Sequence, residues 1–121
     1  MTTLLWLGAA LLGGVGAVAR FRLDATVQLR VSDEFPLGTL CVNAAGSFCL
    51  GLLTGLAVTG DAFFLAGTAT LGSFTTFSTW MLETERLSED GELGIAAANV
   101  LGALVVGALA AALGWALGAV L

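Results

Sequence analysis

Four apolar stretches, separated by short polar connections, account for almost the whole chain. They cover residues 3–19, 37–58, 62–82 and 93–121. Each is near the roughly 20 residues that an α-helix needs to cross a bilayer. Because lipid offers no water to backbone groups, such a chain folds as membrane-spanning helices. The sequence therefore predicts an all-α integral membrane protein in which residues 1–121 form a single four-helix transmembrane domain.

The composition agrees with this class and excludes several functions. Hydrophobic residues make up 58% of the 121 positions, and charged residues make up 11%. Lys and His are both absent, and these are the residues that a phosphate-binding loop and most zinc sites require. Four Arg against nine acidic residues provide no basic surface for nucleic acid. We therefore expect neither an enzyme, nor a nucleotide-driven pump, nor a nucleic-acid-binding protein.

The third stretch is unusually polar for a membrane span. Residues 67–80 hold seven hydroxyl side chains and three aromatic ones, so this segment must face protein or a wet path rather than lipid. Gly72 beside the hydroxyl cluster permits a break in the helix, and a broken helix presents carbonyls to a cation and N–H groups to an anion. The alternative is an unbroken helix whose hydroxyls bond to carbonyls one turn earlier.

A polar line runs along the second stretch. Thr39, Asn43 and Ser47 are spaced four residues apart and so share one helix face. The NH₂ group of Asn43 is a neutral donor that can replace water around an anion. The alternative role for this amide is a hydrogen bond that holds two helices together.

Aromatic residues and one Arg complete the set of candidate site residues. Phe74, Phe77 and Trp80 recur every three residues, so at least two can share a lining and point their positive ring edges at an anion. Plain packing is the alternative for these rings. Arg20 ends the first stretch, where it either reaches the lipid headgroups or forms a positive vestibule.

Glycine pairs with a spacing of four indicate close helix packing. They include Gly51 with Gly55 and Gly114 with Gly118. Such pairs let helix backbones approach each other in lipid. We expect most of these contacts within one four-helix unit, although a dimer is also expected because a single unit is a thin wall around a pore.

Three blocks of sequence form a pattern, and they read Gly13-Gly-x-Gly-Ala-x-x-Arg20, Gly38-Thr-Leu-x-Val-Asn43-x-x-Gly46-Ser-Phe48-x-x-Gly51 and Gly72-x-Phe-Thr-Thr-Phe-Ser-Thr-Trp80-x-x-Glu83. In order and spacing they resemble the small four-span fluoride channels of the Fluc/CrcB family. The third block is highly specific, and the length and number of spans agree over the whole chain.

The resemblance implies a fold, a function and a set of site residues. The fold is an antiparallel dimer of four-span subunits with a broken third helix, and the function is passive export of cytoplasmic fluoride. A structural sodium ion between the subunits would bind backbone carbonyls of Gly72 and Thr75. Asn43, Phe77 and Trp80 would contact fluoride along its path, and Arg20 would lie near an aqueous vestibule. The polar patterns of the second and third stretches add Thr39, Ser78 and Thr79 as candidate path residues.

The chain departs from the family pattern at two places. The family usually has Phe where this chain has Trp80, whose larger ring would narrow the path or offer its indole N–H to the anion. In the fourth stretch the family commonly has several polar residues, whereas here only Asn99 is polar. We expect a sparse polar lining on that helix.

Two other functions are compatible with a small four-span protein. A proton-coupled small multidrug exporter needs an ionisable group inside a span, and residues 3–19 contain no acid. A non-conducting membrane scaffold would not explain why hydroxyls and an amide line up along two spans. We expect a multi-pass protein of a bacterial or archaeal cell membrane.

The basic residues predict an orientation and a partner. The first and third connections lie on one side of the membrane and hold every basic residue, namely Arg20, Arg22, Arg30 and Arg86. The positive-inside rule places these connections in the cytoplasm and both termini outside. Because an antiparallel homodimer needs a chain that inserts both ways, we expect a heterodimer with a homologous chain of opposite orientation. Pairing with itself remains the alternative.

Overall fold

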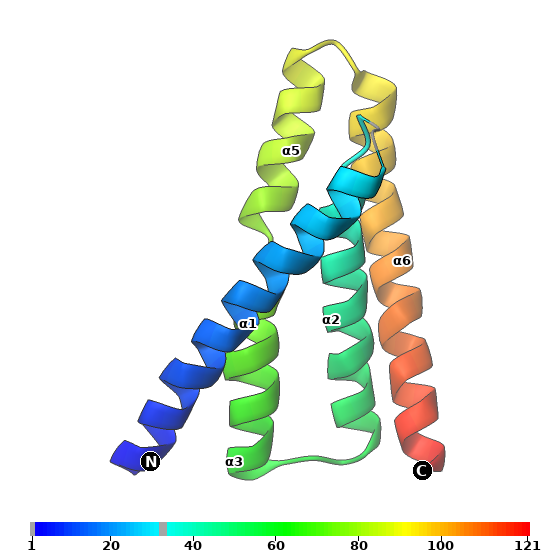
Figure 1. Ribbon diagram of the computed structural model, residues 1–121. Coiled ribbons are helices and arrows are strands. Elements are labelled where there is room, and N and C mark those ends of the chain that lie inside the picture. The colour runs from blue at the N-terminus through cyan, green and yellow to red at the C-terminus, as the bar shows by residue number, and fades with distance from the viewer. Residues whose placement is uncertain (1, 32–33) are drawn as a thin grey trace.

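The computed structural model describes residues 2–31 and 34–121, and every element within them is helical. Three unbroken helices are long and apolar enough to cross a membrane: α1 (Thr3–Arg30), α2 (Leu37–Gly55) and α6 (Leu93–Val120). The third span is a stack of four shorter pieces (Figure 1), namely α3 (Gly60–Phe63), η1 (Phe64–Leu71), α4 (Gly72–Phe74) and α5 (Ser78–Glu89). The predicted all-helical, multi-pass class with a broken third helix is confirmed.

The first helix is longer than predicted. We expected a span over residues 3–19 and a partly helical connection from Arg20 to Pro36, but α1 continues without interruption to Arg30. The residues after Arg20 are mostly good helix formers, and Pro36 is the first residue that stops a helix. The expected helical part of residues 20–30 is confirmed, but the prediction that they are separate from the first span was wrong. Ser32 and Asp33 lie outside the described residues.

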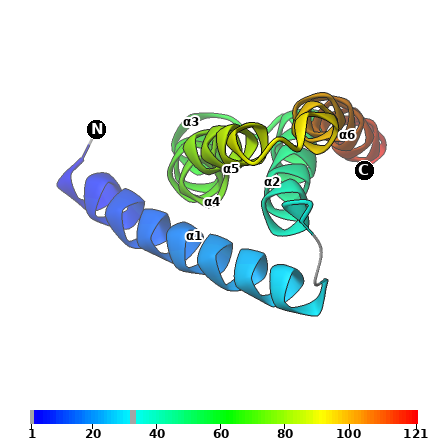
Figure 2. The same ribbon diagram turned by 90° about the horizontal axis from the view of Figure 1, so that it is seen from above.

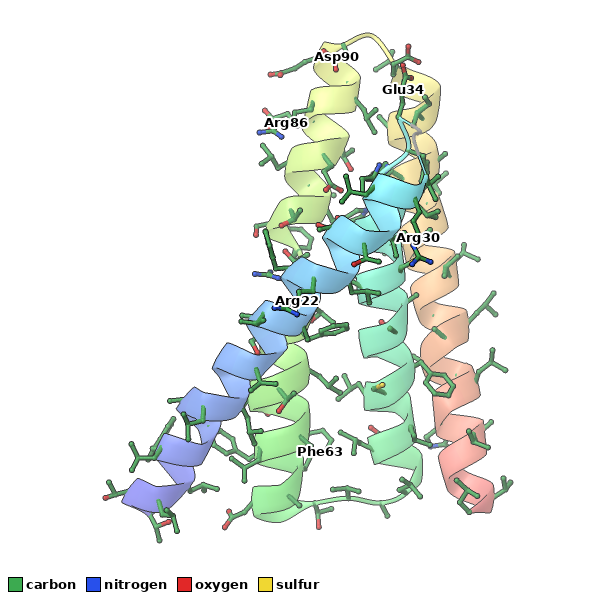
Figure 3. All side chains as sticks on the ribbon, viewed as in Figure 1. Arg22, Arg30, Glu34, Phe63, Arg86 and Asp90 are labelled. Carbon is green, nitrogen blue, oxygen red and sulfur yellow. The ribbon has the colours of Figure 1, made fainter. Side chains whose placement is uncertain are left out.

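The connections alternate between the two ends of the molecule. Both termini and the connection between α2 and α3 lie at one end, and the other two connections lie at the opposite end (Figure 1). Figure 3 shows Glu34, Arg86 and Asp90 at the end with two connections and Phe63 toward the other, with Arg22 about midway along α1. The first and third connections thus share one side, as expected.

Helices α2 and α6 pack with their backbones in close contact. A Cβ atom on Gly51 would collide with the carbonyl of Ala111, and one on Gly114 would collide with the carbonyl of Phe48. The predicted role of these glycines in packing within one unit is confirmed. The second and third spans run antiparallel as expected, but α2 makes its main contact with α6 (Figure 2).

Helix α1 crosses one side of the other helices and contacts η1, α4 and α2 (Figure 2). Gly16 lies at its crossing with the third span, where a Cβ atom would collide with the Thr70 carbonyl oxygen and the Ser73 hydroxyl. Gly14, two residues earlier, has nothing within 4 Å of such an atom. The absence of a side chain at Gly16 thus fixes α1 directly against the segment that precedes the break.

The third span changes its helical form before it breaks. Residues 64–71 form a π-helix, in which the Thr70 hydroxyl donates to the Leu65 carbonyl at 2.8 Å. After α4 the backbone turns extended at Thr75, with φ −81° and ψ 160°. Gly72 is itself helical, with φ −62° and ψ −34°. The break therefore lies three residues beyond the glycine that we expected to permit it.

Candidate functional site

One side chain from α2 takes up the backbone groups that the break leaves unpaired. The Nδ2 atom of Asn43 donates to the Thr76 carbonyl at 2.8 Å, and its Oδ1 atom accepts from the Thr76 N–H at 2.8 Å. These bonds satisfy both polar backbone groups of Thr76. Because an amide NH₂ carries two hydrogens, Asn43 keeps one further donor. The amide therefore links two spans and still has a hydrogen to offer.

Several carbonyl oxygens, those of Gly72 and Thr75 among them, lose their helical partners at the break. In a continuous helix Gly72 would accept from the N–H of Thr76, and Thr75 would accept from the N–H of Thr79. Both donors are engaged elsewhere, since Thr76 bonds to Asn43 and the N–H of Thr79 bonds to the Thr76 hydroxyl at 3.2 Å. These are the two carbonyls that the resemblance assigns to a cation, and released carbonyls of this kind bind small cations.

A hollow of about 360 Å³ lies between α2 and the third span at the level of the break. Asn43, Gly72, Thr75, Phe77 and Trp80 all line it. The two aromatic rings meet edge to face, with centroids 5.6 Å apart and an interplanar angle of 77°. The Phe77 side chain is 70% exposed, so its ring is available to whatever enters or covers the hollow.

The indole N–H of Trp80 does not point freely into this hollow. It donates to the backbone carbonyl of Asn99 in α6 at 3.1 Å. Of the two roles considered for the larger ring, the structure thus favours narrowing of the hollow over donation to an anion.

A second, smaller hollow of about 150 Å³ lies on the α1 side of the break. Arg20, Thr39 and Thr79 line it, and Thr76 lines both hollows. The Thr76 hydroxyl donates to that of Thr79 at 3.1 Å, which leaves the Thr79 proton available. Ser78 is exposed at the start of α5 and lines neither of the two hollows beside the break.

A third hollow, of about 720 Å³, opens at the end that carries two connections. It shares Phe21 and Asp24 with the small hollow. Its charged lining consists of Asp24, Glu34, Glu83, Asp90, Glu92 and Arg86. Their shared lining residues therefore place the three hollows one after another between this acidic end and the break.

Glu83 lies one residue beyond the apolar stretch 62–82 and marks the inner edge of this acidic end. Its Oε1 atom accepts from the Thr39 hydroxyl at 2.9 Å, while Oε2 is buried without a partner. The hydroxyl of Thr39 is thus engaged with Glu83 rather than exposed in the small hollow.

Comparison with known families identifies the chain. The sequence profile of the family described as "CrcB-like protein, Camphor Resistance (CrcB)" matches residues 7–115. The chain belongs to the CrcB family. This match covers all three sequence blocks that carried the resemblance, which is therefore confirmed.

Several CrcB relatives are similar to the chain over most of its length. "Fluoride-specific ion channel FluC 2" of Mycolicibacterium paratuberculosis is 54% identical over 94% of each chain. The protein of the same name in Mycobacterium tuberculosis is 50% identical over 94% of this chain and 90% of the relative. The one in Haloarcula marismortui is 48% identical over 85% of this chain and 84% of the relative. The names of these relatives describe channels rather than enzymes.

The CrcB motifs did not reveal every residue that shapes the site. Thr76 was one hydroxyl in a cluster of seven, and only the structure shows that its backbone groups are the ones captured by Asn43. The Thr84 hydroxyl, which accepts from the Asn99 side chain at 2.9 Å, was not considered. The position of Thr84 one helical turn after Trp80 could have indicated its bond to the Trp80 carbonyl. Its second partner, Asn99, lies on a different helix and could not be found in this way.

Proposed function

We propose that this chain is one subunit of a fluoride-conducting channel. The observation that carries the proposal is the pair of bonds between Asn43 and Thr76, which fixes the break beside a hollow lined by Phe77 and Trp80. Relatives that are about half identical over most of the chain are named fluoride-specific ion channels.

The groups around the break suit a small, strongly hydrated anion. Fluoride must exchange its water for many weak donors and must not be trapped by a strong one. The remaining N–H of Asn43 and the hydroxyl of Thr79 are neutral donors, and aromatic ring edges carry positive potential. Arg20 in the small hollow adds a positive charge that attracts anions without lying at the break itself.

The released carbonyls of Gly72 and Thr75 are the proposed ligands of a structural sodium ion. Their geometry fits the ion, because both oxygens lack helical donors and both residues line the same hollow. Bound there, the ion would neutralise the negative ends of these dipoles. Asn43 would contribute indirectly, because its bond to Thr76 keeps the Gly72 carbonyl without a partner.

We propose that the channel is an antiparallel dimer. Two carbonyls from one chain provide only part of the coordination that a sodium ion needs, and a second chain in the opposite orientation would supply an equivalent pair. The exposed ring of Phe77 also lies where a second subunit can cover the hollow. The partner is a homologous chain of opposite orientation, and the dimer lies in a bacterial or archaeal cell membrane, where it lets cytoplasmic fluoride leave passively.

Fluoride efflux from liposomes tests this function. The protein, purified alone and together with a homologous chain of opposite Arg distribution, is reconstituted into liposomes loaded with potassium fluoride. After valinomycin is added, we expect rapid fluoride release on a fluoride electrode from the paired protein and little release from chloride-loaded liposomes on a chloride electrode. Equal rates for the two anions, or no release from either preparation, would refute the proposal.

A further inference from the structure

Trp80 is fixed by a closed set of three hydrogen bonds that joins α5 to α6. Its indole Nε1 donates to the Asn99 carbonyl at 3.1 Å. The Nδ2 atom of Asn99 donates to the Thr84 hydroxyl at 2.9 Å. That hydroxyl donates to the Trp80 carbonyl at 2.8 Å, which closes the set. Two of the three bonds cross between the helices.

The direction of each bond determines which way the Asn99 amide faces. The Thr84 hydroxyl has a single proton, which it gives to Trp80, so it can only accept from Asn99. The Asn99 side chain is fully buried, and its Oδ1 atom has no donor. A buried acceptor without a partner is costly, and an apolar residue would avoid that cost. The Asn99 side chain thus contributes to the contact between α5 and α6 through its NH₂ group, which donates to Thr84.

This arrangement decides which part of Trp80 lines the hollow. The indole N–H is held against α6, and the ring packs edge to face with Phe77. An indole N–H is a stronger hydrogen-bond donor than an aromatic ring edge. If it turned into the hollow, it would bind an anion tightly, whereas conduction needs sites that release the ion.

We propose that Thr84 and Asn99 are positioning residues that hold the indole N–H of Trp80 away from the anion path. The effect of this positioning on transport rests on the proposed fluoride conduction. The orientation of the Trp80 indole can be measured without any transport. Neither Thr84 nor Asn99 lines the hollow at the break. The bond between their side chains ties α5 to α6 and so keeps the backbone carbonyl of Asn99, which accepts from the indole N–H, within reach of Trp80.

Fluorescence of Trp80 tests the orientation directly. Trp6→Phe and Trp115→Phe leave Trp80 as the single tryptophan. In this background Thr84→Val and Asn99→Leu should lower the anisotropy of Trp80 and increase its quenching by acrylamide, while Thr84→Ser should keep both values. Thr54→Val is the matched control, because the Thr54 hydroxyl likewise donates to a carbonyl one turn earlier, that of Leu50 at 2.9 Å. Unchanged anisotropy and quenching in Thr84→Val would overturn the proposal.

Fluoride efflux then tests the consequence for transport. In the otherwise native protein Thr84→Val should lower fluoride efflux about fivefold, the factor that one neutral hydrogen bond typically carries. In a Trp80→Phe protein, which has no indole N–H to hold, the same substitution should cause no further loss. An equal loss in both backgrounds would contradict a role through Trp80. If Thr84→Val changes the fluorescence of Trp80 but the native protein conducts no fluoride, the positioning role stands and only the proposed function is refuted.

Discussion

Asn43 in α2 and Thr76 at the break exchange two hydrogen bonds of 2.8 Å each. A single amide thereby replaces the helical partners of a residue 33 positions further along the chain. The same contact leaves the Gly72 carbonyl without its usual donor. The break, the candidate cation ligands and the candidate anion donor thus depend on one side chain.

Asn43→Asp should abolish fluoride efflux. The carboxylate cannot donate to the Thr76 carbonyl, and it places a negative charge where an anion must pass. An unpaired carbonyl costs about 1–3 kcal/mol, which the protein can tolerate in part, so the dimer should still form. Efflux from liposomes and size-exclusion chromatography of the same preparation measure the two effects. Native efflux in this variant would exclude Asn43 from the path.

Phe77→Ile should sharply lower fluoride efflux, because the side chain keeps roughly its size and loses its positive ring edge. Phe64→Ile is a matched control. Phe64 forms the same kind of edge-to-face pair with Trp6, with centroids 5.6 Å apart, and does not line the hollow at the break. Efflux should be close to native in the control. If the two variants behave alike, the Phe77 ring is only a packing residue.

Gly16→Ala should destabilise the protein, and Gly14→Ala should not. A methyl group on Gly16 must displace the Thr70 carbonyl and the Ser73 hydroxyl, whereas one on Gly14 meets nothing within 4 Å. Overpacking of this kind typically costs about 1–3 kcal/mol. Thermal unfolding in detergent, followed by circular dichroism, measures the difference. Equal melting temperatures would mean that α1 can shift freely against the third span.

The chain should insert in one orientation, with its first and third connections in the cytoplasm. Because α1 extends to Arg30, both Arg20 and Arg22 lie two or more turns before the end of a helix rather than beside a connection. Arg30 and Arg86 lie in the last turns of α1 and α5, next to the first and third connections, so the count of basic residues still favours the end with two connections by two to none. Expressed alone, the protein should therefore give little fluoride resistance, and a homologous chain of opposite bias should restore it.

Cysteine labelling measures this orientation. In a protein with Cys41→Ala and Cys49→Ala, a Ser88→Cys substitution near the third connection should react only with a reagent that enters the cytoplasm. Comparable labelling from both faces, together with full resistance from this chain alone, would indicate a homodimer whose subunits insert both ways.

The sequence predicted the helices and the polar segment well, because both depend on local composition. Long apolar stretches gave α2 and α6 to within a few residues, and the hydroxyl cluster located the break to within one turn. A partly helical connection was expected after Ala19, but its continuity with the first span was missed because its charged residues resemble a connection. Charge and helix propensity conflicted there, and the helix continued.

Contacts between helices could not be predicted from spacing alone. The amide of Asn43 was expected either to meet an anion or to link two helices, and spacing did not identify Thr76 as its partner. The bond from Trp80 to Asn99 likewise depends on how α5 leans toward α6. Such pairings follow from the packing of whole helices, which glycines such as Gly51 and Gly114 determine through backbone contact.

The π-helix before the break lets the third span hold one residue more than an ordinary α-helix would hold there. Each residue of an α-helix advances the chain by about 100° around its axis, and a residue of a π-helix advances it by less. Deleting one residue from 64–71 would therefore let an ordinary α-helix form while the residues on either side keep nearly the same facing. Deleting one residue between Trp80 and Thr84, where the helix is ordinary, would instead turn the Thr84 hydroxyl about 100° away from Asn99. The π-helix is thus the part of the third span whose length can change with the least effect on the contacts around Trp80.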